Sequence, residues 1–317
     1  MIRRLVAVFA VAGLAACSSG GGSPDADPSS PAASGSGSAS AIPVRLAGSL
    51  QNPCWSPSSD QLALTRFRDG YNAGPSDLVV TPLDGTPARV VTTSVADNVN
   101  LPGSCWDRAG RIVYSTDGAA GDEIWTTSAS GNPGPAGRGR ALGWEPSFSP
   151  DGQWVVFEGH NQAGTDGGTL WKVRRDGAGL VQLTRGADDR EPNWSPRGDR
   201  IVFQSMRGGN WDVWTIDASG RQLRRVTTDP SEDTDPSWSP DGQRIVYSSD
   251  GGGRDLADLF VVTPGAAPAE LHAVPDTAYA GAPAWSPDGQ RIAFETGTGD
   301  PDGSAGTHIA VVPAPAG

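Results

Sequence analysis

Hydrophobic and polar residues alternate in a repeating unit from residue 42 to the end of the chain. The clearest units open on a Pro-x-Trp stretch, followed by a Ser-Pro-Asp-Gly turn, and the other units carry weaker forms of it. A second stretch places an isoleucine and an aromatic residue two positions apart, as in Ile245 and Tyr247, so that both face one side of a strand. Third and fourth stretches, such as residues 212–214 and 223–227, complete the unit. The pattern predicts four short antiparallel strands per unit.

Six copies of the unit follow one another. Their anchor aromatic residues stand 42 to 51 positions apart, at Trp55, Trp106, Phe148, Trp194, Trp238 and Trp285. A period of about 46 residues suits a four-stranded propeller blade. We therefore expect an all-β fold, a six-bladed β-propeller of four-stranded antiparallel blades over residues 42–317, whose aromatic columns pack one blade against the next. The last copy has only three strands, and we expect Ile42 to Leu46 to add its outer strand and close the ring.

Composition supports this fold and excludes one class of partner. The 317 residues include 43 Gly and 27 Pro, which favours short strands and turns over long helices. Basic residues number 24 and acidic residues 36, for a formal net charge of -12. We expect no nucleic-acid partner, because phosphate contacts need clustered lysine and arginine.

The chain before the repeats has a different character. Two arginines precede an apolar run that ends in Leu-Ala-Ala-Cys at Cys17, which is the pattern of an export signal over residues 1–16. This ending resembles a bacterial lipobox, which implies cleavage before Cys17 and lipid attachment to its thiol; an ordinary signal peptide cut nearby is the alternative. Residues 18–41 contain only Ser, Gly, Ala, Pro and two Asp. Such a segment buries too little apolar surface to order, so residues 17–41 are predicted to be a lipidated, disordered tether.

The two remaining cysteines occupy equivalent positions in neighbouring units. Cys54 and Cys105 each stand directly before an anchor tryptophan. In an oxidising compartment an even pair favours a disulfide. The bond requires Cα atoms within about 7 Å, a distance that the sequence does not give.

The repeat is similar to the WD40-like Pro-Asp repeat (PD40) of the TolB family of propellers. Residues 283–294 carry the whole Pro-x-Trp-Ser-Pro-Asp-Gly-x-x-Ile-x-Phe string, and the resemblance extends over residues 42–317. It implies a propeller. Similar propellers serve as protein-docking platforms in the bacterial envelope, as accessory domains of serine peptidases and occasionally as polysaccharide lyases. TolB itself carries a folded domain before its propeller, where this chain has the tether.

The loops that differ between units share one face of the predicted propeller, which we expect to be the recognition surface. The residue three positions before each anchor aromatic begins an inner strand on that face, near the central channel. With their neighbours these positions give the candidate ligand contacts: Asn52, Glu145, Asp188, Asp189, Glu191, Asp233 and Asp235. An acidic arc attracts a basic peptide or a cation. The alternative is that these carboxylates accept backbone hydrogen bonds at strand starts or pair with Arg190 and Arg207.

Residues typical of catalysis or metal binding do not form a recognisable set. His160, His272 and His308 fall at different places in their units, so we expect surface or packing roles and no metal site. The chain has no Gly-x-Ser-x-Gly, His-Glu-x-x-His or Gly-Lys phosphate motif. We expect a protein that is not an enzyme and needs no cofactor.

Two functional hypotheses remain. The leading one is an exported, monomeric propeller, anchored to the cell membrane through the lipid on Cys17, that faces the periplasm or cell exterior. It would bind an envelope protein or peptide on its variable-loop face. The alternative is a cell-surface saccharide-binding protein or a propeller hydrolase or lyase that uses the channel carboxylates.

Overall fold

The computed structural model describes residues 40–41, 47–94, 105–118, 121–131, 134–135, 142–160, 167–298 and 306–316. These residues belong to the second of two units of the chain, Ser36–Gly317. The predicted signal peptide, Cys17 and all of the tether except Ser40 and Ala41 lie outside the described residues. Among the described residues there is no helix with the length and apolar character needed to cross a bilayer.

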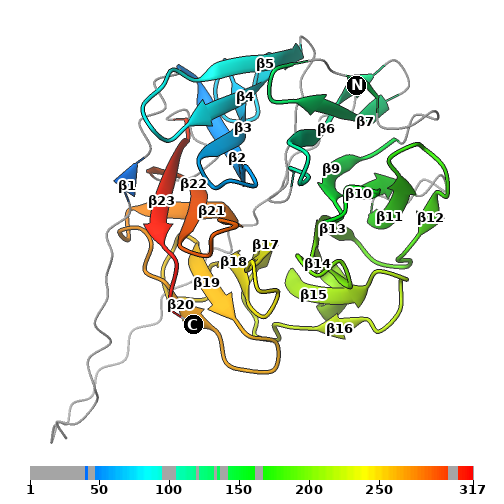
Figure 1. Ribbon diagram of the computed structural model, residues 1–317. Helices are drawn as coiled ribbons and strands as arrows, with labels where there is room; N and C mark the ends of the chain where they lie inside the picture. Colours follow the sequence, from blue (N-terminus) through cyan, green and yellow to red (C-terminus); the bar gives the residue numbers. More distant parts are fainter. Residues whose placement is uncertain are drawn as a thin grey trace, which may run out of the picture. The chain divides into compact units, whose positions relative to one another are not determined.

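The described residues form antiparallel sheets arranged around a common axis, with one short 3-10 helix, η1 (Met206–Gly208) (Figure 1). Five sheets have four strands. The first contains β2 (Ser49–Trp55), β3 (Gln61–Phe67), β4 (Ser76–Pro82) and β5 (Arg89–Ser94). The next contains β9 (Trp144–Phe148), β10 (Trp154–His160), β11 (Gly168–Arg174) and β12 (Val181–Gln182). It is followed by β13 (Asp189–Trp194), β14 (Arg200–Ser205), β15 (Asp212–Asp217) and β16 (Arg224–Arg225).

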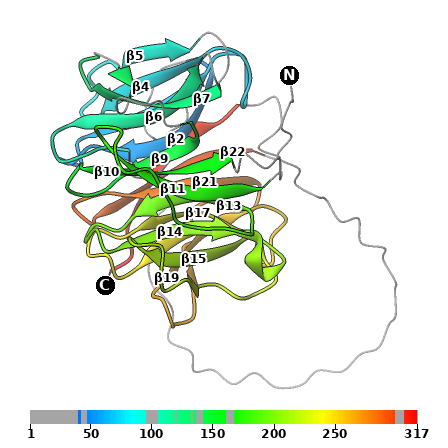
Figure 2. The same ribbon diagram turned by 90° about the vertical axis from the view of Figure 1, so that its right-hand side faces the viewer.

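Two more four-stranded sheets complete this set. One contains β17 (Asp233–Trp238), β18 (Ile245–Ser249), β19 (Asp258–Val262) and β20 (Ala269–Glu270). The other contains β21 (Ala278–Trp285), β22 (Arg291–Thr298), β23 (His308–Pro313) and β1 (Ser40–Ala41). The inner strands β2, β9, β13, β17 and β21 lie near the middle of the molecule in both views (Figures 1 and 2). The prediction of a β-propeller built from four-stranded antiparallel blades is therefore confirmed.

Among the described residues there are five such blades, not the predicted six. The unit of Trp106 gives a three-stranded sheet of β6 (Arg111–Gly118), β7 (Gly121–Ser128) and β8 (Gly134–Pro135). Where the other units have an inner strand, the described residues of this unit form one isolated bridge, between Trp106 and Ile112. Residues 95–104, which include most of the predicted inner strand of this unit, lie outside the described residues.

The outer strand of the last sheet comes from the N-terminal side of the chain. Ser40 pairs with Val311, and Ala41 pairs with Ala310. The predicted closing segment, Ile42 to Leu46, lies outside the described residues. Closure of the ring by that segment therefore stays a prediction.

The core lies between neighbouring sheets and contains the anchor aromatic residues. Trp194, for example, is 5% exposed and packs with Val156 and Leu170 of one sheet and with Phe203 of its own. The first and last sheets meet in the same way. The Trp55 indole Nε1 donates to the Ala284 carbonyl at 2.9 Å, so sheets distant in sequence are neighbours in the ring.

The predicted disulfide is present. Cys54 of β2 bonds to Cys105, and their Cα atoms are 6.0 Å apart, within the range that a disulfide allows. Because Cys105 precedes the three-stranded sheet, the bond ties that sheet to the inner strand of the β2–β5 sheet.

Candidate functional site

Each inner strand of the five four-stranded sheets contains a bulge at the residue three positions before its anchor aromatic. The sheet register shifts there in every case. The residues have left-handed φ angles between 44° and 53°: Asn52, Glu145, Glu191, Asp235 and Ala282. A bulge redirects a side chain, and a left-handed backbone is strained for residues other than glycine. The repeat thus places a strained backbone at the predicted ligand positions.

Side chains of the neighbouring sheet hold most of these bulges in place, because the backbone N–H of a bulge residue donates to one of them. The donor and acceptor pairs are Glu191 with Glu145 Oε2 (2.9 Å), Asp235 with Gln204 Oε1 (2.8 Å), Ala282 with Asp235 Oδ2 (3.3 Å) and Asn52 with Glu295 Oε2 (3.3 Å). Carboxylates therefore accept backbone hydrogen bonds at these strands, which is the alternative that the sequence left open. The acceptor in each case belongs to the adjacent sheet, so these bonds cross the interface between sheets.

The second strands contribute two carboxyl groups that the sequence analysis missed. Glu158 of β10 is 4% exposed and Glu295 of β22 is 6% exposed. Each directly follows the aromatic residue of its second strand. Gln204 occupies the same position of β14. An alignment of the six units at the position after this aromatic residue would have revealed the two glutamates.

These carboxyl groups are close enough to influence one another, and we call Glu145, Glu158, Glu191, Asp235 and Glu295 the inner-strand carboxyl cluster. The charge of Glu145 acts on the carboxyl groups of both Glu158 and Glu191 and raises their pKa values. The charge of Asp235 raises the pKa of Glu191 and also that of Glu295. The five groups thus form one connected network from four sheets.

Burial and mutual repulsion raise pKa values in the network. Burial, reinforced by the charge of Glu145, holds the pKa of Glu158 and of Glu191 well above the usual range for glutamate. Burial raises the pKa of Asp235 to about 6. Burial, with the charge of Asp235, raises the pKa of Glu295 to about 8. Glu295 therefore carries a proton at neutral pH, which reduces the repulsion within the cluster.

One arginine borders the cluster. The Arg190 guanidinium forms two hydrogen bonds to Asp188, at 2.9 Å and 2.7 Å, and its Cζ lies 5.2 Å from the centre of the Trp211 ring. Asp188 also accepts the Gly168 N–H at 2.7 Å. The predicted pairing of Asp188 with Arg190 is therefore present, and it leaves the cluster with more carboxyl groups than neighbouring cations.

Two predicted ligand contacts lie inside the protein. Asp189 and Asp233 are both 0% exposed. Asp189 accepts hydrogen bonds from the Ser205 hydroxyl and the Arg207 guanidinium, each at 2.6 Å. Asp233 takes the same place in β17. At 0% exposure neither carboxylate reaches the surface that a protein partner would contact, whereas Asn52, Glu145, Glu191 and Asp235 are half-buried.

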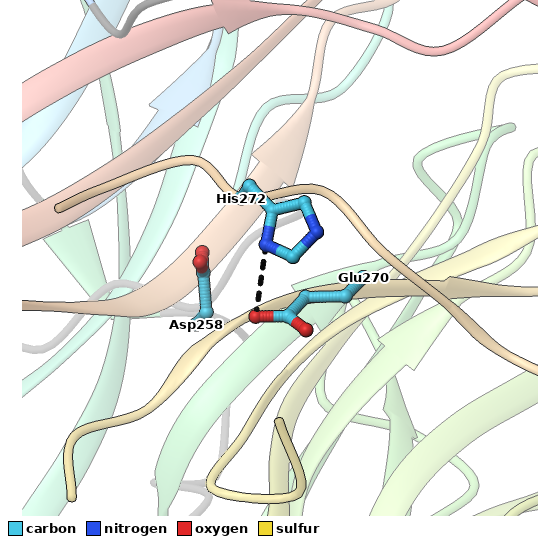
Figure 3. Close-up of side chains that lie close together, drawn as sticks. All are labelled: Asp258, Glu270 and His272. Carbon is cyan, nitrogen blue, oxygen red and sulfur yellow. Dashed lines mark ion pairs between the residues drawn. The ribbon is translucent and has the colours of Figure 1, made fainter. Parts of the chain in front are cut away.

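A second group of polar side chains lies away from the inner strands, on β19, β20 and the loop that follows. Its members are Asp258, Glu270 and His272, whose potential ligand atoms lie within 4.8 Å of one another (Figure 3). It is the only such group of three found among the described residues.

Comparisons with known proteins agree with this architecture. Residues 186–300 match the family model described as the TolB beta propeller domain, PD40. The chain carries a TolB-like PD40 propeller. The resemblance inferred from the repeat is thus confirmed. An uncharacterized protein of Agrobacterium fabrum, Atu1656, is 30% identical over 165 residues, which cover 47% of this chain and 50% of the relative.

Other relatives match shorter segments. The Tol-Pal system protein TolB of Anaeromyxobacter dehalogenans is 31% identical over 92 residues, covering 29% of this chain and 20% of the relative. The TolB-like propeller thus aligns with half or less of the length of these two relatives.

Solved structures share the fold. Putative TolB from Agrobacterium tumefaciens has a TM-score of 0.61 at 21% identity and covers 84% of this chain and 91% of that one. TolB from Acinetobacter baumannii has a TM-score of 0.60 at 19% identity, with 84% and 64% covered. Oligogalacturonate lyase in complex with manganese has a TM-score of 0.53 at 16% identity, with 83% and 76% covered. At these identities the likeness concerns the fold alone.

Proposed function

We propose that the TolB-like propeller is a binding platform, not an enzyme, and that it receives a lysine or arginine side chain of a protein or peptide partner at the inner-strand carboxyl cluster. The observation that carries the proposal is the network of five carboxyl groups around Glu145. A cationic side chain makes charge-assisted hydrogen bonds to carboxylates, which are stronger than those between neutral groups. The cluster offers several acceptors in one place.

Exposure decides which members meet the partner first. Glu145, Glu191 and Asp235 are half-buried, and Glu158 and Glu295 are buried. The partner's cation would contact the half-buried carboxyl groups and displace the protons that the cluster holds. Binding would therefore release protons and would weaken as the pH falls, because protonated carboxyl groups attract a cation less.

A crosslinking experiment in intact cells tests the proposal. The tagged full chain is crosslinked, and the attached peptides are identified by mass spectrometry for the wild type and for the double variant Glu191→Gln, Asp235→Asn. We expect a partner whose lysine- or arginine-rich segment is joined near β13 and β17, and its loss in the double variant. Unchanged crosslinks in that variant would refute the cluster as the contact.

The matched control changes an acidic residue away from the cluster. Asp176 is exposed in the turn between β11 and β12, where its carboxylate accepts the Ala178 N–H. Asp176→Asn removes a charge without touching the cluster, so partner capture should persist. Loss of capture in both variants would point to net charge as the cause.

We also infer that the protein is exported and held at the membrane by a lipid on Cys17, with the propeller acting as a monomer outside the cytoplasm. The Leu-Ala-Ala-Cys pattern and the confirmed disulfide support this location, because structural disulfides persist in oxidising compartments. Metabolic labelling with a palmitate analogue tests the anchor. Label on the wild type and none on Cys17→Ser is expected, and equal labelling would refute lipidation at this residue.

Catalysis or saccharide binding is the second candidate. The raised pKa of Glu295, about 8, is the feature that favours it, because a carboxyl group protonated at neutral pH can act as a general acid. A panel of acidic and neutral oligosaccharides, assayed by thermal shift and by product analysis, separates the candidates. Stabilisation or turnover that Glu295→Gln abolishes would favour this function over the platform.

A further inference from the structure

Equivalent positions in two neighbouring sheets carry opposite charges. In the sheet β13–β16, Asp212 of β15 forms an ion pair with Arg225 of β16 at 2.7 Å. In the sheet β17–β20, the strand registers place Asp258 at the position of Asp212 and Glu270 at that of Arg225. Two carboxylates thus face the space that an ion pair fills in the adjacent sheet. Such a pair is unfavourable unless positive charge is added.

The third member of the group also departs from its counterparts. Two neighbouring sheets have Thr184 and Thr227 where this one has His272, and both threonine hydroxyls accept a backbone N–H of the third strand. The His272 imidazole points to the carboxylates instead, with Nδ1 3.2 Å from Glu270 Oε1 (Figure 3). A structural threonine is thus replaced by a residue that ligates metals.

The ligand atoms of Glu270 and His272 are spaced as they would be around one small ion, and that of Asp258 lies within 4.8 Å of both. Ligand atoms about 2.0–2.2 Å from a shared zinc ion lie roughly 3–4 Å from each other. The 3.2 Å separation of Glu270 Oε1 from the imidazole falls in this range. Glu270 Oε1 is buried and accepts no hydrogen bond from the described residues. Asp258 is 1% exposed, and its Oδ1 accepts the N–H groups of Leu259 and Ala273, which fixes its orientation.

Arg254 already supplies part of the compensating charge. Its Nη1 lies 2.5 Å from Asp258 Oδ2 and 4.0 Å from Glu270 Oε1. The guanidinium is held in place by the carbonyls of Pro275 and Ala278. Two carboxylates, one buried and one partly buried, stand beside one guanidinium, so one negative charge is not compensated. A carboxylate oxygen has two lone pairs, so Asp258 can keep Arg254 and still ligate an ion.

We propose that Asp258, Glu270 and His272 bind a divalent transition-metal ion of the Zn²⁺ type. The mixed nitrogen and oxygen donors favour Zn²⁺, Co²⁺ or Ni²⁺ over Ca²⁺, which prefers oxygen ligands alone. The ion ties β20 and the loop after it to β19. The site is separate from the inner-strand carboxyl cluster and does not depend on the function proposed for it, and it revises the expectation of no metal drawn from the histidine positions.

Isothermal titration of metal-free full-length protein with ZnCl₂ tests the site. We expect one ion per chain in the wild type and at least roughly tenfold weaker binding in His272→Ala and in Glu270→Gln, because each removes one of three ligands. His308→Ala is the matched control, since His308 is exposed on β23, far along the chain from the site, and binding should be unchanged. Absence of binding, or equal affinity in wild type and His272→Ala, would overturn the proposal.

Thermal unfolding gives a second readout that does not depend on heat of binding. Zn²⁺ should raise the Tm of the wild type and of His308→Ala, but not that of His272→Ala, because only a bound native state is stabilised. Both substituted side chains are partly exposed, so the metal-free variants should keep the wild-type circular dichroism spectrum. An equal rise of Tm in all three proteins would place the metal elsewhere and refute the assignment.

Discussion

At the residue scale, Glu145 is the link between two sheets. Its Oε2 accepts the Glu191 N–H, and its charge raises the pKa values of the Glu158 and Glu191 carboxyl groups. A buried cluster of ionised carboxylates would repel itself, and shared protons remove that repulsion. Glu295, which accepts the N–H of the Asn52 bulge, therefore also carries a proton that a cationic partner can displace.

The stored protons predict how stability changes with pH. The ordinary pKa of a glutamate is 4.5, and in the folded protein burial raises that of Glu295 to about 8. The folded state binds the proton more tightly than the unfolded chain, so stability falls as the pH rises from 4.5 to 8 and stays reduced above that range. Glu295→Gln should raise the free energy of unfolding at pH 8.5, on the order of a few kcal/mol, and change little at pH 4.

Urea unfolding of both proteins at the two pH values measures this difference. The amide can still accept the Asn52 N–H that Glu295 accepts, so the hydrogen bond is not the variable. A variant that is less stable than the wild type at pH 8.5 would show that Glu295 is ionised and favourably paired.

Asp189 and Asp233 offer a matched pair for a second prediction. Arg207 pairs with Asp189, whereas Gly251 stands at the corresponding place near Asp233, and burial raises the pKa of Asp233 to about 6. Asp233→Asn should raise the Tm at pH 8, because it removes a buried charge that has no arginine. Asp189→Asn should lower the free energy of unfolding by roughly 2 kcal/mol, because it leaves Arg207 without its carboxylate. Differential scanning calorimetry compares them, and a shift of the same sign in both would contradict this account.

At the scale of the elements, the repeat predicted the strands well and the site only in part. Turn residues and the spacing of isoleucine and aromatic residues are local signals, and they located the second strands of which Ile245 and Tyr247 are examples. The alternation of hydrophobic and polar residues did not reveal Glu158 and Glu295. Neighbouring sheets cover both faces of a propeller sheet, so a polar residue on the face opposite the aromatic residue is buried too. It also left Asp233 as a surface candidate, since burial depends on a neighbouring sheet that the local pattern does not describe.

The disulfide between Cys54 and Cys105 is expected to contribute to the free energy of unfolding. Cys54 and Cys105 are 51 residues apart, and closing a loop of that length stabilises by about 4 kcal/mol on the entropy model. Replacing both cysteines with serine should lower the free energy of unfolding toward that extent. Chemical unfolding with and without a reducing agent measures it. The reductant should destabilise the wild type and leave the double variant unchanged, and an effect on the variant would contradict the assignment.

At the scale of the whole molecule, the ring depends on contacts between sheets distant in sequence. The Arg291 guanidinium lies 4.7 Å from the centre of the Trp55 ring, and the Ser49 and Thr307 hydroxyls are 2.6 Å apart. A sixfold repeat predicted a ring of six four-stranded blades, yet the described residues of the Trp106 unit form a three-stranded sheet. The ring brings the members of the inner-strand carboxyl cluster together, although they are separated by up to 150 residues in the chain (Glu145 to Glu295).

Binding of a cationic peptide tests the central claim most directly. Fluorescence anisotropy would give the affinity of a labelled nona-arginine peptide for the wild type, for Glu191→Gln with Asp235→Asn, and for a surface double variant, Asp176→Asn with Asp217→Asn. Each double variant replaces two acidic residues by their amides, and Asp176 and Asp217 are not in the cluster. The account predicts that affinity falls at least roughly tenfold in the cluster variant and much less in the surface variant. Equal losses, or none, would contradict it.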